Sequence, residues 1–270
     1  MKYKVGFIGA GNTGKSFIRC LIESKAIQPN EAIVYDPIDR KRVFIENLGV
    51  AWGQNNEDVI ENAHVVFLAL KPQDFFKSIE PMSSVFSKTQ IIASLAPGID
   101  LEDIERVIPH GRIVRVTPVF VPKGVIGYQH DGSDEALGAT IEDLLKPLGF
   151  VYQVNDAETF DALSVCCTSG PAFIVELMLY WQEWIEERGI DSDVARQMTT
   201  LTFWGASQLA LDNMNCSLTD LQTRISIKKG GTVAGLESMQ ELEVERMLRY
   251  SFEKAALRIK DLGKKASAPR

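Results

Sequence analysis

The sequence predicts an α/β fold: an N-terminal doubly wound parallel sheet (residues 1–156) followed by an all-helical domain (residues 157–270). Three observations predict it. Short apolar runs alternate with amphipathic runs over the first ~150 residues, which is typical of βα units around a parallel sheet. A glycine-rich turn directly follows the first apolar run. From Ala157 onward, apolar residues recur at helical spacing and no strand is expected.

Six apolar runs are expected to form the sheet. Several end at a proline, as at Lys71-Pro72 and Thr117-Pro118, where the missing N–H prevents further ladder pairing. The expected strands are Lys4–Ile8, Ala32–Tyr35, Val65–Leu70, Ile91–Leu95, Ile113–Val116 and Phe150–Val154, with a helix at Asn12–Glu23 after the first.

Four segments of the second half carry helical spacing. They are Pro171–Arg188, Ser192–Asp212, Ser217–Ile225 and Glu243–Leu262. Ser192 and Ser217 stand where an N-cap is expected, because their hydroxyls can accept a hydrogen bond from the first turn. The small, basic tail Gly263–Arg270 is expected to be a disordered terminus.

One segment could cross a membrane by length, because Glu176 is the only charged residue from Ala162 to Trp181. Ser169-Gly170-Pro171 interrupts it, and charged residues follow Trp181 closely. We therefore expect a loop and then a helix that starts at Pro171, buried either in a core or against a partner subunit.

Composition excludes several classes. With 45% hydrophobic and 24% charged residues in 270, the chain is typical of soluble globular proteins and not of collagen, coiled coils or disordered chains. Its 29 basic and 36 acidic residues give a net charge of −7, so neither nucleic acid nor an anionic membrane is expected as a partner. No secretory signal is visible. The four cysteines lack metal-ligand spacing and are expected to be reduced, buried thiols of a cytoplasmic protein.

The turn Gly9-Ala10-Gly11-Asn12-Thr13-Gly14 is a complete GxGxxG between the first strand and its helix. Glycines there allow a tight turn and close approach of a pyrophosphate, which the free N–H groups of the helix then bind. The context predicts a Rossmann dinucleotide site, with Gly9, Gly11, Asn12, Thr13 and Gly14 as cofactor-binding residues.

Asp36 ends the second expected strand, where a carboxylate accepts hydrogen bonds from the adenosine ribose. A carboxylate repels a 2′-phosphate, which favours NADH. Arg40, Lys41 and Arg42 follow closely and could receive that phosphate, so NADPH stays open.

Two segments of the helical half resemble a known family. Asp161–Phe173 contains Ser169-Gly170-Pro171-Ala172-Phe173, and Gly230–Leu236 reads Gly-Gly-Thr-Val-Ala-Gly-Leu. With Val5–Gly14, Lys71-Pro72-Gln73 and Val114-Arg115-Val116 before Pro118, they resemble the pyrroline-5-carboxylate reductase family in order and spacing along nearly the whole chain.

The resemblance implies reduction of the ring imine of 1-pyrroline-5-carboxylate to proline with NADH or NADPH. It implies a C-terminal substrate-binding and dimerisation domain, and hence an obligate homodimer or a higher assembly of dimers. Leu70, Lys71 and Pro72 join the expected cofactor-binding residues. Gly230, Gly231 and Thr232 are the expected substrate-binding residues, with backbone amides for the carboxylate and Thr232 as the catalytic hydroxyl at the ring nitrogen.

An anion nest at a helix start agrees with that assignment on physical grounds. Hydride transfer to an iminium needs little acid–base chemistry, which suits a chain whose three histidines (His64, His110, His130) stand in no catalytic pattern.

The loop Ile227-Lys228-Lys229 departs from the family pattern, with lysines for a proline and a glycine. A reductase of another imine or keto acid, or a non-catalytic nucleotide-binding regulator, therefore stays open.

Overall fold

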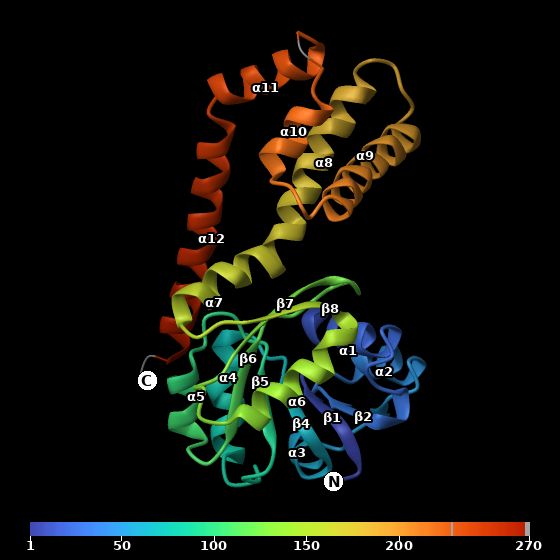
Figure 1. Cartoon of the computed structure of the whole chain (residues 1–270). Helices are drawn as coiled ribbons and strands as arrows, with labels where there is room; N and C mark the ends of the chain where they lie inside the picture. The colour runs from blue at the N-terminus through green and yellow to red at the C-terminus, as the bar shows by residue number, and fades with distance from the viewer. Residues whose placement is uncertain (228, 268–270) are drawn as a thin grey trace. The chain divides into compact units, whose positions relative to one another are not determined.

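The computed structural model describes residues 1–227 and 229–267, which form two compact units (Figure 1). The first comprises Met1–Ser169 together with the chain from Ala255 onward, and the second comprises Gly170–Lys254. The expected boundary after residue 156 lies within the first unit, so the division into domains 1–156 and 157–270 stays a proposal.

The first unit contains one eight-stranded sheet with the order β3-β2-β1-β4-β5-β6-β7-β8. All neighbours pair in parallel except β6 and β7. The strands are β1 Tyr3–Ile8, β2 Ala32–Tyr35, β3 Ala51–Trp52, β4 Ala63–Leu68, β5 Ile91–Ser94, β6 Arg112–Val116, β7 Gly124–Gln129 and β8 Gly149–Gln153. The order of the strands switches between β1 and β4: β2 and β3 are added on one side of β1, and β4 and the later strands on the other. In sheets of this kind, ligands bind at the carboxyl ends of the strands at the switch point.

Helices cover both faces of this sheet (Figure 1). Helices α1 Asn12–Glu23, α2 Arg42–Asn47 and α6 Glu135–Leu145 bury apolar residues on one face. Helices α3 Asn56–Asn62, α4 Pro72–Ile79 and α5 Leu101–Val107 cover the other. The rings of Phe7 and Phe67 stack at 4.8 Å beneath Phe17 of α1, so the helix that follows the glycine turn is held firmly on the sheet.

The remaining helices are α7 Ala157–Ser164, α8 Gly170–Glu186, α9 Ser192–Asp212, α10 Leu218–Ile225, α11 Gly231–Glu241 and α12 Val244–Ser267. Within the described residues, no strand follows β8, as predicted.

All six predicted strands are present, Ala32–Tyr35 with its predicted bounds and the others with ends shifted by one or two residues, but two further strands were missed. β3 has only two residues, which is too short for a periodic signal. β7 has glycine at its first and fourth positions (Gly124 and Gly127), and glycine weakens the sequence pattern of a strand.

The predicted loop at Ser169-Gly170-Pro171 is wrong. Val165–Ser169 forms a π-helical turn that joins α7 directly to α8. A wider turn accommodates Pro171, which has no N–H to continue the α-helical ladder. The Thr168 hydroxyl donates to the Ser164 carbonyl at 2.6 Å within it.

The predicted disorder of the tail is wrong for Gly263–Ser267, which belongs to α12. The Gly263 backbone lies against Gly98 so closely that a Cβ would stand 1.7 Å from the Gly98 carbonyl oxygen. Two glycines therefore permit this contact. Residues 268–270 lie outside the described residues.

The two predicted N-caps have different outcomes. The Ser217 hydroxyl accepts from the N–H of Asp220 at 3.0 Å, which confirms the cap of α10. Ser192 is instead the first residue of α9, and Asp191 caps it by accepting from the N–H of Asp193 at 3.0 Å. A carboxylate one residue earlier is the stronger acceptor near the positive end of the helix.

Helices α8 and α9 expose many large apolar side chains, which a helix buried in a core would not do. Within the described chain no α8 residue is buried. Trp181 and Phe203 pack on each other at 5.1 Å, but these residues stay exposed: Ile174, Val175, Leu179, Trp184, Leu201 and Trp204. Ala157–Glu186 is long and apolar enough to cross a membrane by length and composition, with 17% of its most apolar window buried. The chain's own core therefore does not bury α8, and burial against a partner subunit stays a prediction.

The cysteines are not uniformly buried. Cys20 and Cys167 are buried, and burial raises the pKa of both thiols. Cys166 is exposed and Cys216 partly exposed, so the prediction of four buried thiols is wrong for these two. Cys166 lies on the π turn, and Cys216 follows α9.

Candidate functional site

The glycine turn between β1 and α1 has no room for side chains at two of its three glycines. Gly9 adopts φ +103°, and a Cβ there would stand 2.5 Å from the Ala69 carbonyl oxygen. A Cβ on Gly14 would stand 2.3 Å from the Gly9 carbonyl oxygen. These two glycines are required by the contacts of the turn with β4 and with itself.

Gly11 is different, because a Cβ there would meet no described atom within 4 Å. Packing does not demand glycine at this position, so the space in front of it is open. Gly11 is also the N-cap of α1, and no described side chain caps that end. The first-turn N–H groups of Asn12, Thr13 and Gly14 therefore face that space without intrahelical acceptors. An anion that approaches the backbone closely fits this arrangement.

Asp36 follows β2 and is buried. Its Oδ2 accepts from the N–H of Ala10, in the glycine turn, at 2.8 Å, and its Oδ1 accepts from the N–H of Ile38 at 2.9 Å. The Lys41 ammonium donates to Oδ2 at 2.6 Å. Burial alone raises the pKa of Asp36, but the hydrogen bonds from Lys41, Ile38 and Ala10 outweigh it and lower that pKa below the ordinary value.

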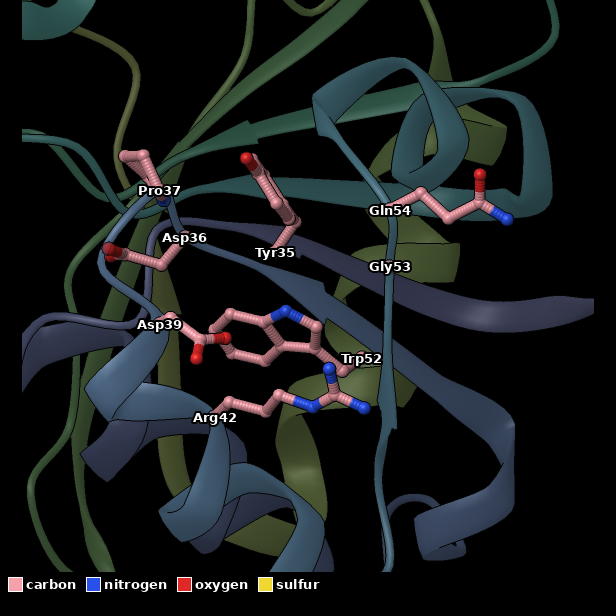
Figure 2. Close-up of a pocket in the computed structure, with 8 residues that line it drawn as sticks. All are labelled: Tyr35, Asp36, Pro37, Asp39, Arg42, Trp52, Gly53 and Gln54. Carbon is pink, nitrogen blue, oxygen red and sulfur yellow. The ribbon is translucent and has the colours of Figure 1, made fainter.

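A cavity of about 400 Å³ opens beside Asp36, as Figure 2 shows. It is lined by the last residues of β2 and β3 and by residues that follow these strands: Tyr35, Asp36, Pro37, Asp39, Arg42, Trp52, Gly53 and Gln54. A second cavity of about 370 Å³ shares Tyr35 and Pro37 and is completed by residues around the start of α3 and by Met82. Polar groups and aromatic faces together suit a nucleoside with a charged substituent.

Tyr35 and Trp52 were missed as candidate site residues. Their rings lie 6.1 Å apart at the carboxyl ends of β2 and β3. The only signal in the sequence was the run Val50-Ala51-Trp52 before Gly53, which is too short to identify a strand.

The predicted residues after β4 lie beside the same turn. A Cβ on Gly9 would be 3.6 Å from the Leu70 side chain, so Leu70 flanks the glycine turn. Lys71 is exposed and is the N-cap of α4, and Pro72 is its first residue. The structure thus brings the glycine turn, Asp36 and Leu70–Pro72 together at the carboxyl ends of β1, β2 and β4.

Gly230, Gly231 and Thr232 belong to the second unit and start α11. Gly230 is its N-cap, without a side-chain cap among the described residues, and a Cβ on Gly231 would meet no described atom within 4 Å. Thr232 is exposed in the single chain. Lys229 precedes them in the left-handed region at φ +60°, and Lys228 lies outside the described residues. This helix start is an open anion nest with a hydroxyl beside it.

The three histidines lie in the first unit, where two of them have hydrogen-bond partners. His110 Nε2 lies 2.8 Å from the Phe86 carbonyl oxygen, and His64 is exposed. His130 is buried, stacks on Tyr128 and hydrogen-bonds Gln153 at 3.1 Å. These surroundings agree with surface or structural roles.

Comparison with known proteins identifies relatives of both halves. A family model described as pyrroline-5-carboxylate reductase dimerisation matches residues 157–262, and one described as NADP oxidoreductase coenzyme F420-dependent matches residues 4–98. A pyrroline-5-carboxylate reductase of Haemophilus influenzae is 31% identical over 242 residues, which cover 87% of this chain and 89% of the relative.

Solved structures of pyrroline carboxylate reductases also resemble this chain. A pyrroline-5-carboxylate reductase from Coxiella burnetii has a TM-score of 0.84 and 26% identity, over 98% of this chain and all of that one. The Plasmodium falciparum pyrroline carboxylate reductase, solved with NADP bound, has a TM-score of 0.84 at 17% identity over 97% of this chain and 99% of that one, a likeness of fold.

Proposed function

This chain belongs to the pyrroline-5-carboxylate reductase family, and on that premise we propose how its residues carry out the reaction. It reduces the cyclic imine 1-pyrroline-5-carboxylate to proline by hydride transfer from NADH or NADPH, a step of proline biosynthesis. The observation that carries this function is the likeness to a named reductase over 87% of the chain. The cofactor half of the site is supported independently by the glycine turn.

The pyrophosphate of the cofactor is bound by the N–H groups of Asn12, Thr13 and Gly14. Gly11 supports this placement, because the space a Cβ would fill there is open although nothing in the protein requires it to be. Gly9 and Gly14 shape the turn, and Leu70, Lys71 and Pro72 border it. The bound dinucleotide supplies the hydride; the protein orients it and excludes water.

The adenosine ribose of the cofactor lies at Asp36. The buried carboxylate favours NADH, because a 2′-phosphate placed beside it would be repelled. Lys41 offsets part of that charge at 2.6 Å, and Arg42 lines the adjoining cavity. We infer that NADH is used at least as well as NADPH, and that the basic residues allow NADPH to bind.

The substrate carboxylate is held by the backbone amides of Gly231 and Thr232, and the Thr232 hydroxyl meets the ring nitrogen. The start of α11 supports this role, because its amides are free of side-chain caps among the described residues. The iminium carbon is already electrophilic, so a hydroxyl that orients the ring is sufficient and no strong acid is needed.

The chain assembles with copies of itself, as its dimerisation-family match indicates. We propose an obligate homodimer, or a larger assembly of dimers, in which α8 and α9 bury their exposed tryptophans and leucines. The family match over 157–262 spans the whole of the apolar helix Ala157–Glu186, which favours a protein partner over lipid for that surface. We propose that the enzyme works in the cytoplasm, where its four free cysteines would stay reduced.

The test is spectrophotometric. Oxidation of NADH and of NADPH is followed with and without 1-pyrroline-5-carboxylate, and with another cyclic imine and a keto acid. Imine-dependent oxidation with proline as product supports the proposal. Oxidation with only another substrate identifies a reductase of different specificity, and tight cofactor binding without oxidation identifies a non-catalytic homologue.

A further inference from the structure

Arg115 on β6 is a fully buried cation that the cofactor and substrate assignments do not use. Its side chain is 2% exposed. A guanidinium stays protonated in proteins, so its charge must be balanced where it lies.

The guanidinium joins three separate elements. Its Nη1 lies 3.0 Å from Asp100 Oδ1 and donates to Gln129 Oε1 at 3.1 Å. Its Nη2 donates to Asp161 Oδ1 at 3.3 Å. Its central carbon lies 4.1 Å from the centre of the Phe160 ring. Its Nε has no partner among the described residues.

The three polar partners of Arg115 come from different parts of the first unit. Asp100 precedes α5, at the end of the segment that leaves the carboxyl end of β5. Gln129 ends β7, and Phe160 and Asp161 belong to α7. The chain passes to the second unit after Ser169, shortly beyond α7. Arg115 therefore binds the segment after β5 to the helix that leads out of the unit.

The returning part of α12 reaches the segment that leads to Asp100. Gly263 rests directly on Gly98, in the segment between β5 and α5. The segment between β5 and α5 thus contacts α12 through Gly98 and Arg115 through Asp100.

A contribution to the stability of the fold does not by itself explain why a buried ion pair is present here. Apolar residues of similar volume often stabilise a core as well as a buried ion pair does, or better. The cluster also stands at the carboxyl ends of β5 and β6, the edge of a doubly wound sheet where ligands bind. We propose that Arg115 is a positioning residue: its bridge to Asp100, Gln129 and Asp161 holds the segment after β5 and α7 in the arrangement that hydride transfer requires. This proposal rests on the proposed reductase function.

The experiment replaces the pair by apolar residues. In the double variant Arg115→Met/Asp161→Met no buried charge of the pair is left uncompensated, so the melting temperature should stay near that of the wild type. We expect kcat to fall about 10- to 100-fold through misalignment, with the KM for the cofactor unchanged. Hydrogen exchange should become faster in residues 95–101 and 157–164.

Arg115→Lys is the second variant. It retains the buried charge but lacks the planar fork whose two terminal nitrogens contact the three partners, so kcat should fall while the fold is kept. Arg112→Met is the matched control, because Arg112 pairs with Asp134 at 2.6 Å at the amino end of the same strand. Its kcat should stay that of the wild type.

Wild-type kcat in the double variant or in Arg115→Lys, or unchanged exchange in the two segments of the double variant, would overturn the proposal. The exchange measurement needs no turnover. It therefore decides the role of Arg115 even if the wild type shows no imine-dependent oxidation, which would count against the proposed function instead.

Discussion

Asp36 and Lys41 form an ion pair of 2.6 Å at the carboxyl end of β2, with the carboxylate buried and the ammonium partly so. The same carboxylate oxygen accepts from the N–H of Ala10 in the glycine turn. The residue expected to select the cofactor is therefore coupled both to the pyrophosphate turn and to a basic residue that could receive a 2′-phosphate.

The first prediction concerns cofactor choice. Asp36→Ala removes the repulsive carboxylate and releases Lys41, so the ratio of kcat/KM for NADPH to that for NADH should rise at least about tenfold, ~1.4 kcal/mol. Lys41→Ala should shift the ratio the opposite way. A wild type that already prefers NADPH by more than about tenfold would contradict the inferred role of Asp36.

The second prediction concerns pH. The pKa of Asp36 is lower in the folded protein than its ordinary value near ~3.9, so its ionised form stabilises the fold above that value. This stabilisation is lost as the pH falls through the lowered pKa. The free energy of unfolding of Asp36→Asn should therefore depend less steeply on pH below about 4 than that of the wild type. Denaturant titrations at fixed protein concentration measure both slopes, and identical slopes would contradict the account.

The third prediction separates two glycines of one turn. Gly11→Ala meets open space, so the fold should persist while NADH binding weakens by tenfold or more, because the methyl group occupies the space proposed for the pyrophosphate. Gly14→Ala places a Cβ 2.3 Å from a backbone oxygen and should lower the melting temperature. Fluorescence titration with NADH and thermal unfolding test the pair. Full NADH affinity in Gly11→Ala would show that the turn is only structural.

The fourth prediction concerns assembly. Light scattering at micromolar concentration should give at least twice the chain mass of 30.0 kDa. Trp204→Glu in α9 should weaken the assembly, because it places a charge on the surface proposed as the interface. Val43→Glu is the matched control, since Val43 and Trp204 are equally exposed at 64% and Val43 lies outside the dimerisation match. A wild-type mass near 30 kDa would refute the obligate dimer.

The sequence predicted the part of the fold in which backbone sterics leave little choice. Gly9 and Gly14 stand where contact with Ala69 and with the turn itself requires glycine, and β1, the turn and α1 were placed correctly. It could not place β3, which has two residues, or the π turn at Val165–Ser169, where a proline signals interruption but not its form. These depend on contacts between distant segments.

The site shows the same limit. The order of residues could name Asp36 and three neighbouring basic residues, but not which of them pairs with it. That choice depends on the path of the chain through the short helical turn Asp39–Lys41. Likewise, apolar spacing identified α8 as a helix, but it could not show that α8 lies outside the chain's own core.

We propose that Thr232 acts on the substrate, and Thr232→Ala tests this role most directly. Loss of one oriented hydrogen bond in a closed site costs on the order of 1–3 kcal/mol. We therefore expect kcat/KM for the imine to fall roughly tenfold to a hundredfold. NADH binding and the melting temperature should be unchanged, and Thr232→Ser should restore most of the activity. A Thr232→Ala variant that is less stable, by the ~1 kcal/mol typical of a lost helix cap, yet fully active would contradict the claim and leave only the cofactor half of the site supported.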